Sequence, residues 1–241
     1  MIELFKLDHS LNFPAHQFAL DEPNGLLAFG GDLSPERLIF AYKHGIFPWF
    51  SKGEPILWWT PDPRGVIYTD TFKASRSLRK SIRKYGYRAT MNHAFKEVIT
   101  ACATVSRRDV DHTSHNGTWI TDEMIHAYIE LHYSGYAHSV EIWDADNKLA
   151  GGLYGIGINA IFCGESMFHN CTDASKAAFL ALVNYMKAND MPLIDCQMNN
   201  QHLKSLGCVE IPRDEFLADL NELINRQSTI SRPWQTTTLS L

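Results

Sequence analysis

The chain has 241 residues, of which 45% are hydrophobic and 20% charged, and its formal net charge is −5 at pH 7. These values are typical of a soluble globular protein with one large domain, or with one domain and a smaller companion. The acidic balance excludes a uniformly basic nucleic-acid-binding surface, so such binding would need a local patch of cations.

The sequence contains no secretory signal pattern and no apolar run long enough to span a bilayer, so we expect a cytoplasmic protein without a membrane partner. Its cysteines are odd in number and lack CxxC spacing, which favours reduced thiols over a disulfide scaffold or a zinc site. They are Cys102, Cys163, Cys171, Cys196 and Cys208. Nothing in the sequence demands more than a monomer.

Residues 1–70 predict a small N-terminal domain. Ser34 is a candidate N-cap, Pro35 suits the first helical position, and Gly45 suits the end of the helix. The stretch that follows, GIFPWFSKGEPILWWTPDPRG, carries four prolines that exclude long regular structure. Its aromatic residues predict an ordered, largely buried connector.

A basic helix is predicted at residues 75–85. At 100° per residue, five cations fall within an arc of roughly 140°, while apolar side chains lie opposite, and no acid occurs between residues 71 and 96. The cations are Arg76, Arg79, Lys80, Arg83 and Lys84. A solvated charged face is the ordinary explanation, but the lack of neutralising carboxylates favours binding of phosphate or of an RNA backbone.

The remaining pattern, over residues 71–241, indicates an α+β domain. Helices near 92–103 and 121–134 precede three strands at 138–144, 148–157 and 159–168. A helix at 173–189, a strand from residue 193 and two helices near 200–206 and 213–226 complete the chain. Three antiparallel strands followed by helix, strand and helix is the order of an acyltransferase-type sheet.

Two further motifs have ordinary explanations. The loop at residues 104–117 contains Asp109, Asp111, His112 and His115, which could bind a metal ion, but its polar surroundings favour an exposed loop. The glycine-rich GGLYGIG precedes a strand rather than a helix, so it predicts a hairpin and not a phosphate-binding loop.

Polar side chains interrupt two of the predicted strands. Because strand side chains alternate, Asp195 and Gln197 share one face in LIDCQ. Glu165 shares a face with Cys163 and Met167 in FCGESMF, unless Gly164 forms a bulge. A buried carboxylate needs a partner, and an ion pair with Arg or Lys, or a brace for the next turn, is the ordinary role. Two such acids in one sheet favour a functional site.

Several long motifs together resemble the leucyl/phenylalanyl-tRNA–protein transferase family. They are EPNGLLAFGGDLSPERLIFAYKHGIFPWF, PILWWTPDPRGVI, GTWIT, AHSVEIW, GGLYGI, FCGESMF, ASKAA and LIDCQMNNQHLKSLGCVEIPRDEF. The resemblance covers residues from about 20 to 220.

This resemblance implies an aminoacyltransferase that moves Leu or Phe from leucyl-tRNA or phenylalanyl-tRNA to the α-amine of proteins with N-terminal Arg or Lys. The product carries a destabilising N-terminus that directs it to degradation. The resemblance also implies a C-terminal domain similar to N-acetyltransferases (GNAT-like), a mixed sheet with flanking helices, and no cofactor or metal. Gln197, Asp195 and Glu165 match the family's catalytic positions, and the basic helix matches its region for tRNA.

The chemistry leaves the role of Gln197 open. Because an aminoacyl ester is activated and an α-amine has a pKa of about 7.7–8.0, catalysis can rest on positioning and oxyanion stabilisation. Gln197 could accept the amine's proton if Asp195 polarises its amide, or it could only position the amine. The apolar substrate pocket is predicted from residues for which core packing is the alternative, namely Trp49, Trp119, Phe162, Met167 and Leu182.

Two other functions are alternatives to aminoacyl transfer. An acetyl-CoA-dependent N-acetyltransferase should have a Q/R-x-x-G-x-G/A loop from the fourth strand of its sheet into the next helix, to hold pyrophosphate, but HNCTDAS between Phe168 and Lys176 contains no glycine. A non-catalytic RNA-binding module would explain the basic helix but not the convergence of Glu165, Asp195 and Gln197.

Overall fold

The computed structural model describes residues 4–104, 120–226 and 233–241. Its small sheet has the spatial order β1 (Phe5–Leu7), β2 (Leu26–Gly30), β4 (Leu57–Trp59) and β3 (Phe47–Pro48). Its large sheet has the order β11 (Val209–Ile211), β5 (Arg64–Tyr68), β10 (Leu193–Gln197), β9 (Ile161–His169), β8 (Leu149–Ile158), β7 (Ala137–Trp143), β6 (Arg88–Met91) and β12 (Thr237–Leu239). The predicted α+β class is confirmed.

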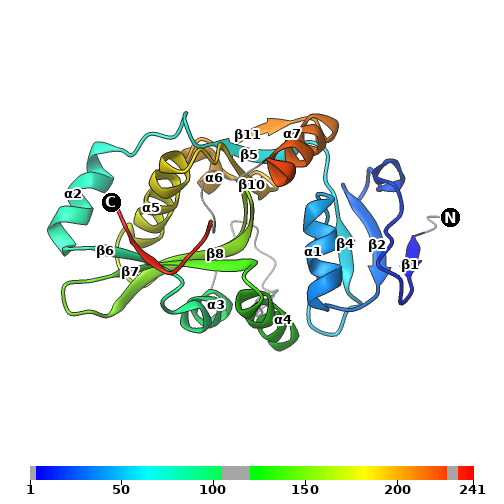
Figure 1. The fold of residues 1–241 in the computed structure, drawn as a ribbon, viewed down its shortest axis with the longest axis horizontal. Coiled ribbons are helices and arrows are strands. Elements are labelled where there is room, and N and C mark those ends of the chain that lie inside the picture. Colours follow the sequence, from blue (N-terminus) through cyan, green and yellow to red (C-terminus); the bar gives the residue numbers. More distant parts are fainter. Residues whose placement is uncertain (1–3, 105–119, 227–232) are drawn as a thin grey trace.

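The helices of the described residues pack beside and between these sheets. They are η1 (His16–Phe18), α1 (Pro35–Lys43), α2 (Arg76–Tyr85), α3 (Phe95–Thr104), α4 (Asp122–Tyr133), α5 (Ala174–Ala188), α6 (Gln201–Ser205) and α7 (Arg213–Asn225). Figure 1 shows the small sheet at one end of the molecule, α1 between it and the rest, and α2 at the opposite end. No helix in the described ranges is both long and apolar enough to cross a membrane.

The predicted N-cap, first-turn proline and C-terminal glycine of α1 are all observed. The hydroxyl of Ser34 accepts a hydrogen bond from the backbone N–H of Arg37 at 3.4 Å, and Pro35 occupies the first turn. Gly45, with φ +70°, follows the C-cap and turns the chain towards β3. In the connector, Phe47 and Trp58 are buried as expected, whereas Trp49 is 38% exposed.

The central strands and long helices were predicted well, whereas the short strands were missed. β7, β8 and β9 are antiparallel neighbours, and α5 matches its predicted bounds to within one residue. The missed strands β5, β6, β11 and β12 are three to five residues long. Segments that short show no alternation that can be distinguished from a loop. The predicted helix at 92–103 begins later than expected, because β6 ends at Met91, Asn92 adopts φ +61° and α3 starts only at Phe95.

The glycines of β8 permit close packing and do not bind phosphate. A Cβ atom at Gly155 would overlap the carbonyl oxygen of Cys163, and one at Gly157 would lie 2.7 Å from the Trp234 ring. The glycine-rich motif is therefore a buried strand, and its following turn at residues 159–160 forms the predicted hairpin with β9.

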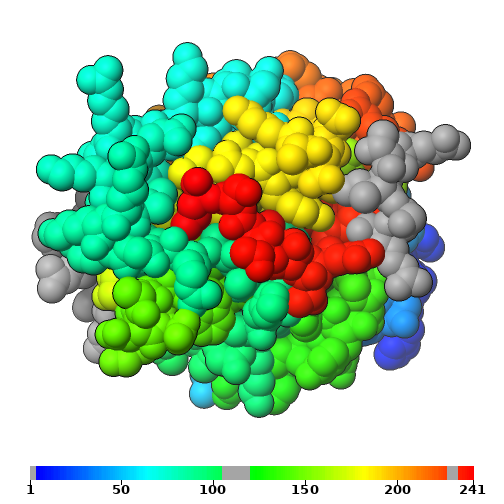
Figure 2. Space-filling view, turned by 60° about the vertical axis from the view of Figure 1, so that its left-hand side comes forward, coloured from blue at the N-terminus to red at the C-terminus, as the bar shows by residue number. Residues whose placement is uncertain are grey.

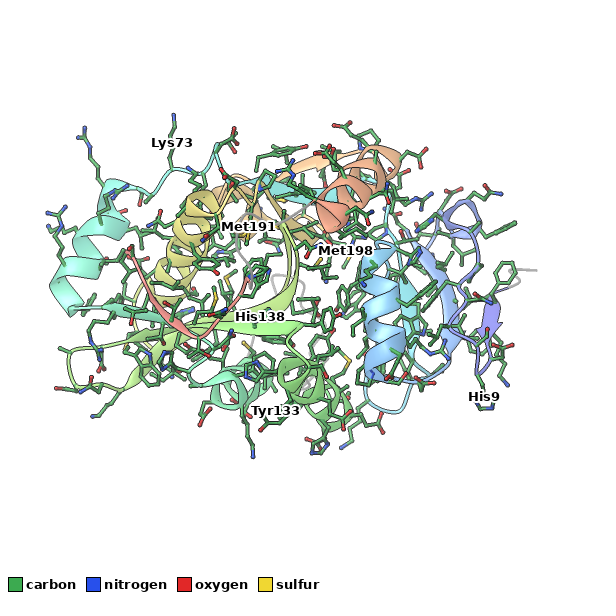
Figure 3. All side chains as sticks on the ribbon, viewed as in Figure 1. His9, Lys73, Tyr133, His138, Met191 and Met198 are labelled. Atoms are coloured by element: carbon green, nitrogen blue, oxygen red, sulfur yellow. The ribbon has the colours of Figure 1, made fainter. Side chains whose placement is uncertain are left out.

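The C-terminal segment closes one side of the large sheet. Trp234 is buried, its backbone N–H donates to the Tyr185 hydroxyl at 3.1 Å, and its ring stacks on His138 at a centroid distance of 5.6 Å. Figure 2 shows this segment, in red, lying across the surface beside α5. Figure 3 shows His138 beneath it, at the centre of the large sheet.

The feature that creates a site is a split between two strands. β10 runs parallel to β9 only from Leu193 to Asp195, opposite Ile161 to Cys163. β9 then continues to His169, whereas β10 turns away at Gln197 and leads into α6. Beyond Cys163 and Asp195 the two strands are therefore no longer paired with each other, and Glu165 and Gln197 lie on either side of the split.

Candidate active site

A buried ion pair supports the end of β10. Arg64 donates from Nε and Nη2 to the two carboxylate oxygens of Asp195, both at 2.8 Å, and both side chains are 1% exposed. Arg64 also donates to the carbonyl oxygen of Gly45 at 3.0 Å and lies between the rings of Phe47 and Phe216. A bidentate pair with its remaining donor satisfied is the geometry in which a buried pair is retained.

This pair determines the backbone conformation at Gln197. The backbone N–H of Gln197 donates to Asp195 Oδ1 at 2.9 Å, and Gln197 adopts φ +63°, a left-handed conformation that is costly for a residue with a side chain. The pairing of β10 with β5 shifts register at the same point. Strict alternation therefore does not extend from Asp195 to Gln197, and the irregularity aims the amide towards β9.

Glu165 receives that amide. Gln197 Nε2 donates to Glu165 Oε1 at 2.7 Å, and the hydroxyls of Tyr42 and Tyr128 donate to the same carboxylate at 2.7 and 3.1 Å. The two hydroxyl oxygens are also in hydrogen-bond contact with each other. Because each hydroxyl has a single proton, the tyrosines donate in two of these three contacts at a time. The register of β8 with β9 shifts at Glu165, which is the bulge foreseen beside Gly164. Tyr42 comes from α1, so both parts of the structure contribute to this site.

The electrostatics of the carboxylate are set by burial. Burial raises the pKa of Glu165 to about 7, and the hydrogen bonds from Tyr42, Tyr128 and Gln197 oppose this rise. Burial also raises the pKa of both tyrosine hydroxyls well above their usual range, so they remain donors. The site thus contains a carboxyl group that changes protonation near neutral pH, held by donors that stay protonated.

These contacts show which of the two acids forms an ion pair or braces the following turn. Asp195 does have an arginine partner and does brace the following turn. Glu165 has no cationic partner among its described contacts and is held by neutral donors. In the expected relay Asp195 polarises the side-chain amide of Gln197, but the contact observed is with its backbone N–H.

The residues expected to line a substrate pocket lie in different surroundings. Phe162 and Leu182 are 1% exposed, and Phe162 packs against Trp234. Met167 is half-buried, with its sulfur 3.4 Å from His202 Nε2, and Trp49 packs against Trp59. Trp119 lies outside the described residues, as does the 104–117 loop from residue 105 onwards. The predicted pocket therefore stays a prediction.

The predicted basic helix forms as α2. Its five cations are exposed and make no ion pair among the described residues, while Leu78 is buried beneath them. Ser81 donates to Asp173 at 2.7 Å, which attaches α2 to the start of α5. Figure 2 shows long side chains projecting from the region of α2 into solvent.

Three residues of this hydrogen-bonded site were not predicted from the sequence. Arg64 follows a run of prolines, and its pairing with Asp195 spans 131 residues. Tyr42 and Tyr128 occupy helix positions that are indistinguishable from core positions. The sequence contains one indirect signal for them: two acids in apolar strands need hydrogen-bond donors, and an Arg guanidinium and Tyr hydroxyls are such donors.

Fold and site together describe an α+β protein with a buried polar cluster at a strand split, the arrangement of a candidate active site. The described residues contain no cluster of metal-ligating side chains. Met198, which follows Gln197, is 40% exposed and lies between the large sheet and α1 (Figure 3).

Comparison with known proteins identifies the family. The model of the leucyl/phenylalanyl-tRNA protein transferase matches residues 66–221, and the model of that family's N-terminal domain matches residues 31–62. Relatives with the name leucyl/phenylalanyl-tRNA–protein transferase are 58% identical in Pseudoalteromonas atlantica, over 93% of both chains, and 53% identical in Tolumonas auensis, over 100% of this chain and 99% of the relative. The chain belongs to the leucyl/phenylalanyl-tRNA–protein transferase family, as its motifs predicted.

A comparison of structures adds little. The structure of L-PGS from Bacillus licheniformis overlaps with a TM-score of 0.39 at 10% identity, covering 69% of this chain and 51% of that chain. This likeness is too low to support a fold assignment.

Proposed function

We propose that this chain transfers Leu or Phe from leucyl-tRNA or phenylalanyl-tRNA to the α-amino group of proteins that begin with Arg or Lys. The transfer creates a destabilising N-terminus on the acceptor protein. The enzyme acts in the cytoplasm as a monomer. Membership of the family, with 52–58% identity to relatives of that name, supports the aminoacyltransferase activity. The hydrogen-bonded set Glu165–Gln197–Asp195–Arg64 at the strand split is the observation that supports its site.

In the proposed reaction the α-amine nitrogen attacks the carbonyl carbon of the aminoacyl ester. The new C–N bond forms while the ester C–O bond to the terminal ribose breaks, the amine loses a proton, and the ribose oxygen gains one. An amine with a pKa of about 7.7–8.0 is partly neutral at pH 7, so the enzyme's main tasks are positioning and stabilisation of the oxyanion.

The contacts suggest a division of labour among the three predicted catalytic residues. Glu165, with a pKa near neutrality, is suited to accept the amine's proton. Gln197 is suited to hold the amine or the ester, since its amide already reaches the carboxylate. Asp195 is fully engaged by Arg64 and is 1% exposed, so we assign it a positioning role through the backbone of Gln197.

We further propose that the large sheet with its flanking helices is a GNAT-like catalytic domain. The strand split between β9 and β10 is consistent with such a fold, in which the acyl donor enters beside the diverging strands. The division into residues 1–70 and 71–241 remains a prediction. The pairing of β5 with β10 favours a boundary before Arg64.

The tRNA would be held by α2 through its cations, Arg76, Arg79, Lys80, Arg83 and Lys84. Exposed, unpaired cations release counterions when they bind phosphates, so this contact should weaken steeply as salt increases. No cofactor is needed, because the ester already carries the activation.

A transfer assay tests the proposal. Purified protein is mixed with radiolabelled Leu-tRNA and a test protein that begins with Arg, without acetyl-CoA, and label in protein is measured. We expect transfer by wild type and a loss of about a hundredfold for Gln197→Ala. Gln201→Ala, an exposed amide on α6, is the matched control.

Three results of the same assay would contradict the proposed function or the role of Gln197. Transfer that survives Gln197→Ala would remove this residue from the mechanism. Acetyl transfer from acetyl-CoA in place of aminoacyl transfer would favour the N-acetyltransferase alternative. RNA binding without any transfer would favour the non-catalytic module.

A further inference from the structure

Three basic side chains from three elements gather beside the strand split. They are His169 at the end of β9, Lys176 in the first turn of α5, and His202 in α6. His202 Nε2 lies 3.4 Å from the sulfur of Met167, which places it over β9. Burial, and to a smaller extent the nearby Lys176 and His169, lower the pKa of His202. His169 lies two residues beyond Met167 on the same strand, so it is on the same face of β9 as the contact with His202. We refer to the three basic side chains as the split cluster.

The cluster has little internal compensation. Asp173, whose pKa is lowered by its hydrogen bond from Ser81 and by Lys176 and His169, is the acid with a described contact here. It accepts from Ser81 at 2.7 Å and from Lys176 at 3.2 Å, so its oxygens are shared with α2. Lys176 is 43% exposed and both histidines are exposed, so one cation and two N–H donors face solvent together on a protein of net charge −5, an arrangement suited to an anionic ligand.

The position of the cluster indicates the ligand. β9 runs from Glu165 to His169, about 13 Å at the rise of a strand, so the cluster begins a short distance from the site. On its other side, α2 is attached to the start of α5 by Ser81–Asp173 and by the Tyr87 hydroxyl, which donates to the Thr172 carbonyl oxygen at 2.8 Å. The split cluster therefore lies between the cations of α2 and the carboxylate of Glu165.

We propose that the split cluster binds the phosphates of the single-stranded 3′ end of the aminoacyl-tRNA. This inference rests on the proposed function and extends it, because α2 alone would hold the tRNA at a distance from the chemistry. Lys176 supplies a permanent charge. The histidines donate N–H groups to phosphate oxygens, which a neutral imidazole can do through one ring nitrogen. The cluster thus directs the ester towards Glu165.

Three donors of decreasing phosphate content test the proposal. They are Phe-tRNA, the phenylalanylated trinucleotide CCA, and phenylalanyl-adenosine, which has no phosphate. The variant is Lys176→Gln/His202→Gln, and the matched control is Lys187→Gln at the far end of α5. A variant of the basic helix, Arg79→Gln/Arg83→Gln, separates the two binding surfaces.

We expect the cluster variant to raise KM for the trinucleotide about tenfold, since charged hydrogen bonds are lost, while KM for phenylalanyl-adenosine is unchanged. The basic-helix variant should raise KM for Phe-tRNA alone. The conservative single variant Lys176→Arg keeps the positive charge and should retain the wild-type KM for the trinucleotide. If Lys176 only supported the packing of α5, this variant would not be expected to restore KM.

Two outcomes would contradict the inference, and they differ from failure of the function. An unchanged KM for the trinucleotide, or an equal rise for phenylalanyl-adenosine, would overturn the split cluster as a phosphate site while wild-type transfer persists. Absence of wild-type transfer from all three donors would overturn the proposed function and this inference with it.

Discussion

Glu165 is the residue for which the structure gives the most quantitative prediction. Its carboxyl group is held at a pKa of about 7, compared with the ordinary 4.5, chiefly by burial. Between these two values the folded protein binds a proton that the unfolded chain has released. Stability should therefore fall as pH rises from about 4.5 to 7 and stay low above that range.

The magnitude follows from the shift. A difference of this size corresponds to about 3 kcal/mol between the protonated and ionised states. Because the side chain is only half-buried, solvent screens part of this, and we expect about 1–2 kcal/mol. The substitution Glu165→Gln removes the charge, so relative to wild type it should gain about 1–2 kcal/mol in the free energy of unfolding between pH 5 and pH 8.

Urea unfolding of both proteins at pH 5 and pH 8 measures this gain. The comparison across pH cancels the hydrogen-bond changes made by the amide, which are the same at both values. Glu130→Gln, an exposed acid on α4, is the control and should show no such gain. A stability difference between Glu165→Gln and wild type that is equal at both pH values would refute the assignment of a raised pKa. The variant should also lose transfer activity.

Further predictions concern the residues around this acid. Asp195→Ala leaves the guanidinium of Arg64 buried without its partner, so urea unfolding should show a loss of about 3–5 kcal/mol in the free energy of unfolding. The double variant Arg64→Met/Asp195→Leu should recover part of that stability but not transfer activity, and full activity in it would contradict the positioning role of Asp195. Tyr42→Phe removes a donor that lowers the pKa of the site carboxylate, so the acidic limb of the pH–rate profile should move to higher pH, and an unmoved limb would exclude that contact. Gly155→Ala would overlap a backbone carbonyl of β9 and should lower the free energy of unfolding by about 1–3 kcal/mol or more, which thermal or urea unfolding can check.

The fold was predictable where the local pattern is long. Helix α1 with its cap at Ser34, the strands β7, β8 and β9, and helix α5 are 7 to 15 residues long and show a consistent period or a terminal signal. Edge strands of three to five residues carry no such signal, and only their pairing partners define them.

The site was predictable in its strand residues but not in their partners. Glu165, Asp195 and Gln197 were detectable because polar groups in apolar strands are unusual, and the structure brings them together. Arg64 and Tyr42 are separated from their partners by more than 120 residues, so no local pattern links them. The bulge that turns Gln197 towards β9 also follows from tertiary contacts rather than from the sequence of β10.

The hydroxyl of Tyr42 gives the N-terminal part of the chain a direct influence on the chemistry. The helix that carries it, α1, packs against α4, α7 and β3. A small displacement of that helix would lengthen one hydrogen bond to Glu165 and make the carboxyl group retain its proton at higher pH. Substitutions in the apolar seat of α1, remote from both substrates, should therefore shift the pH dependence of transfer without changing the affinity for either substrate.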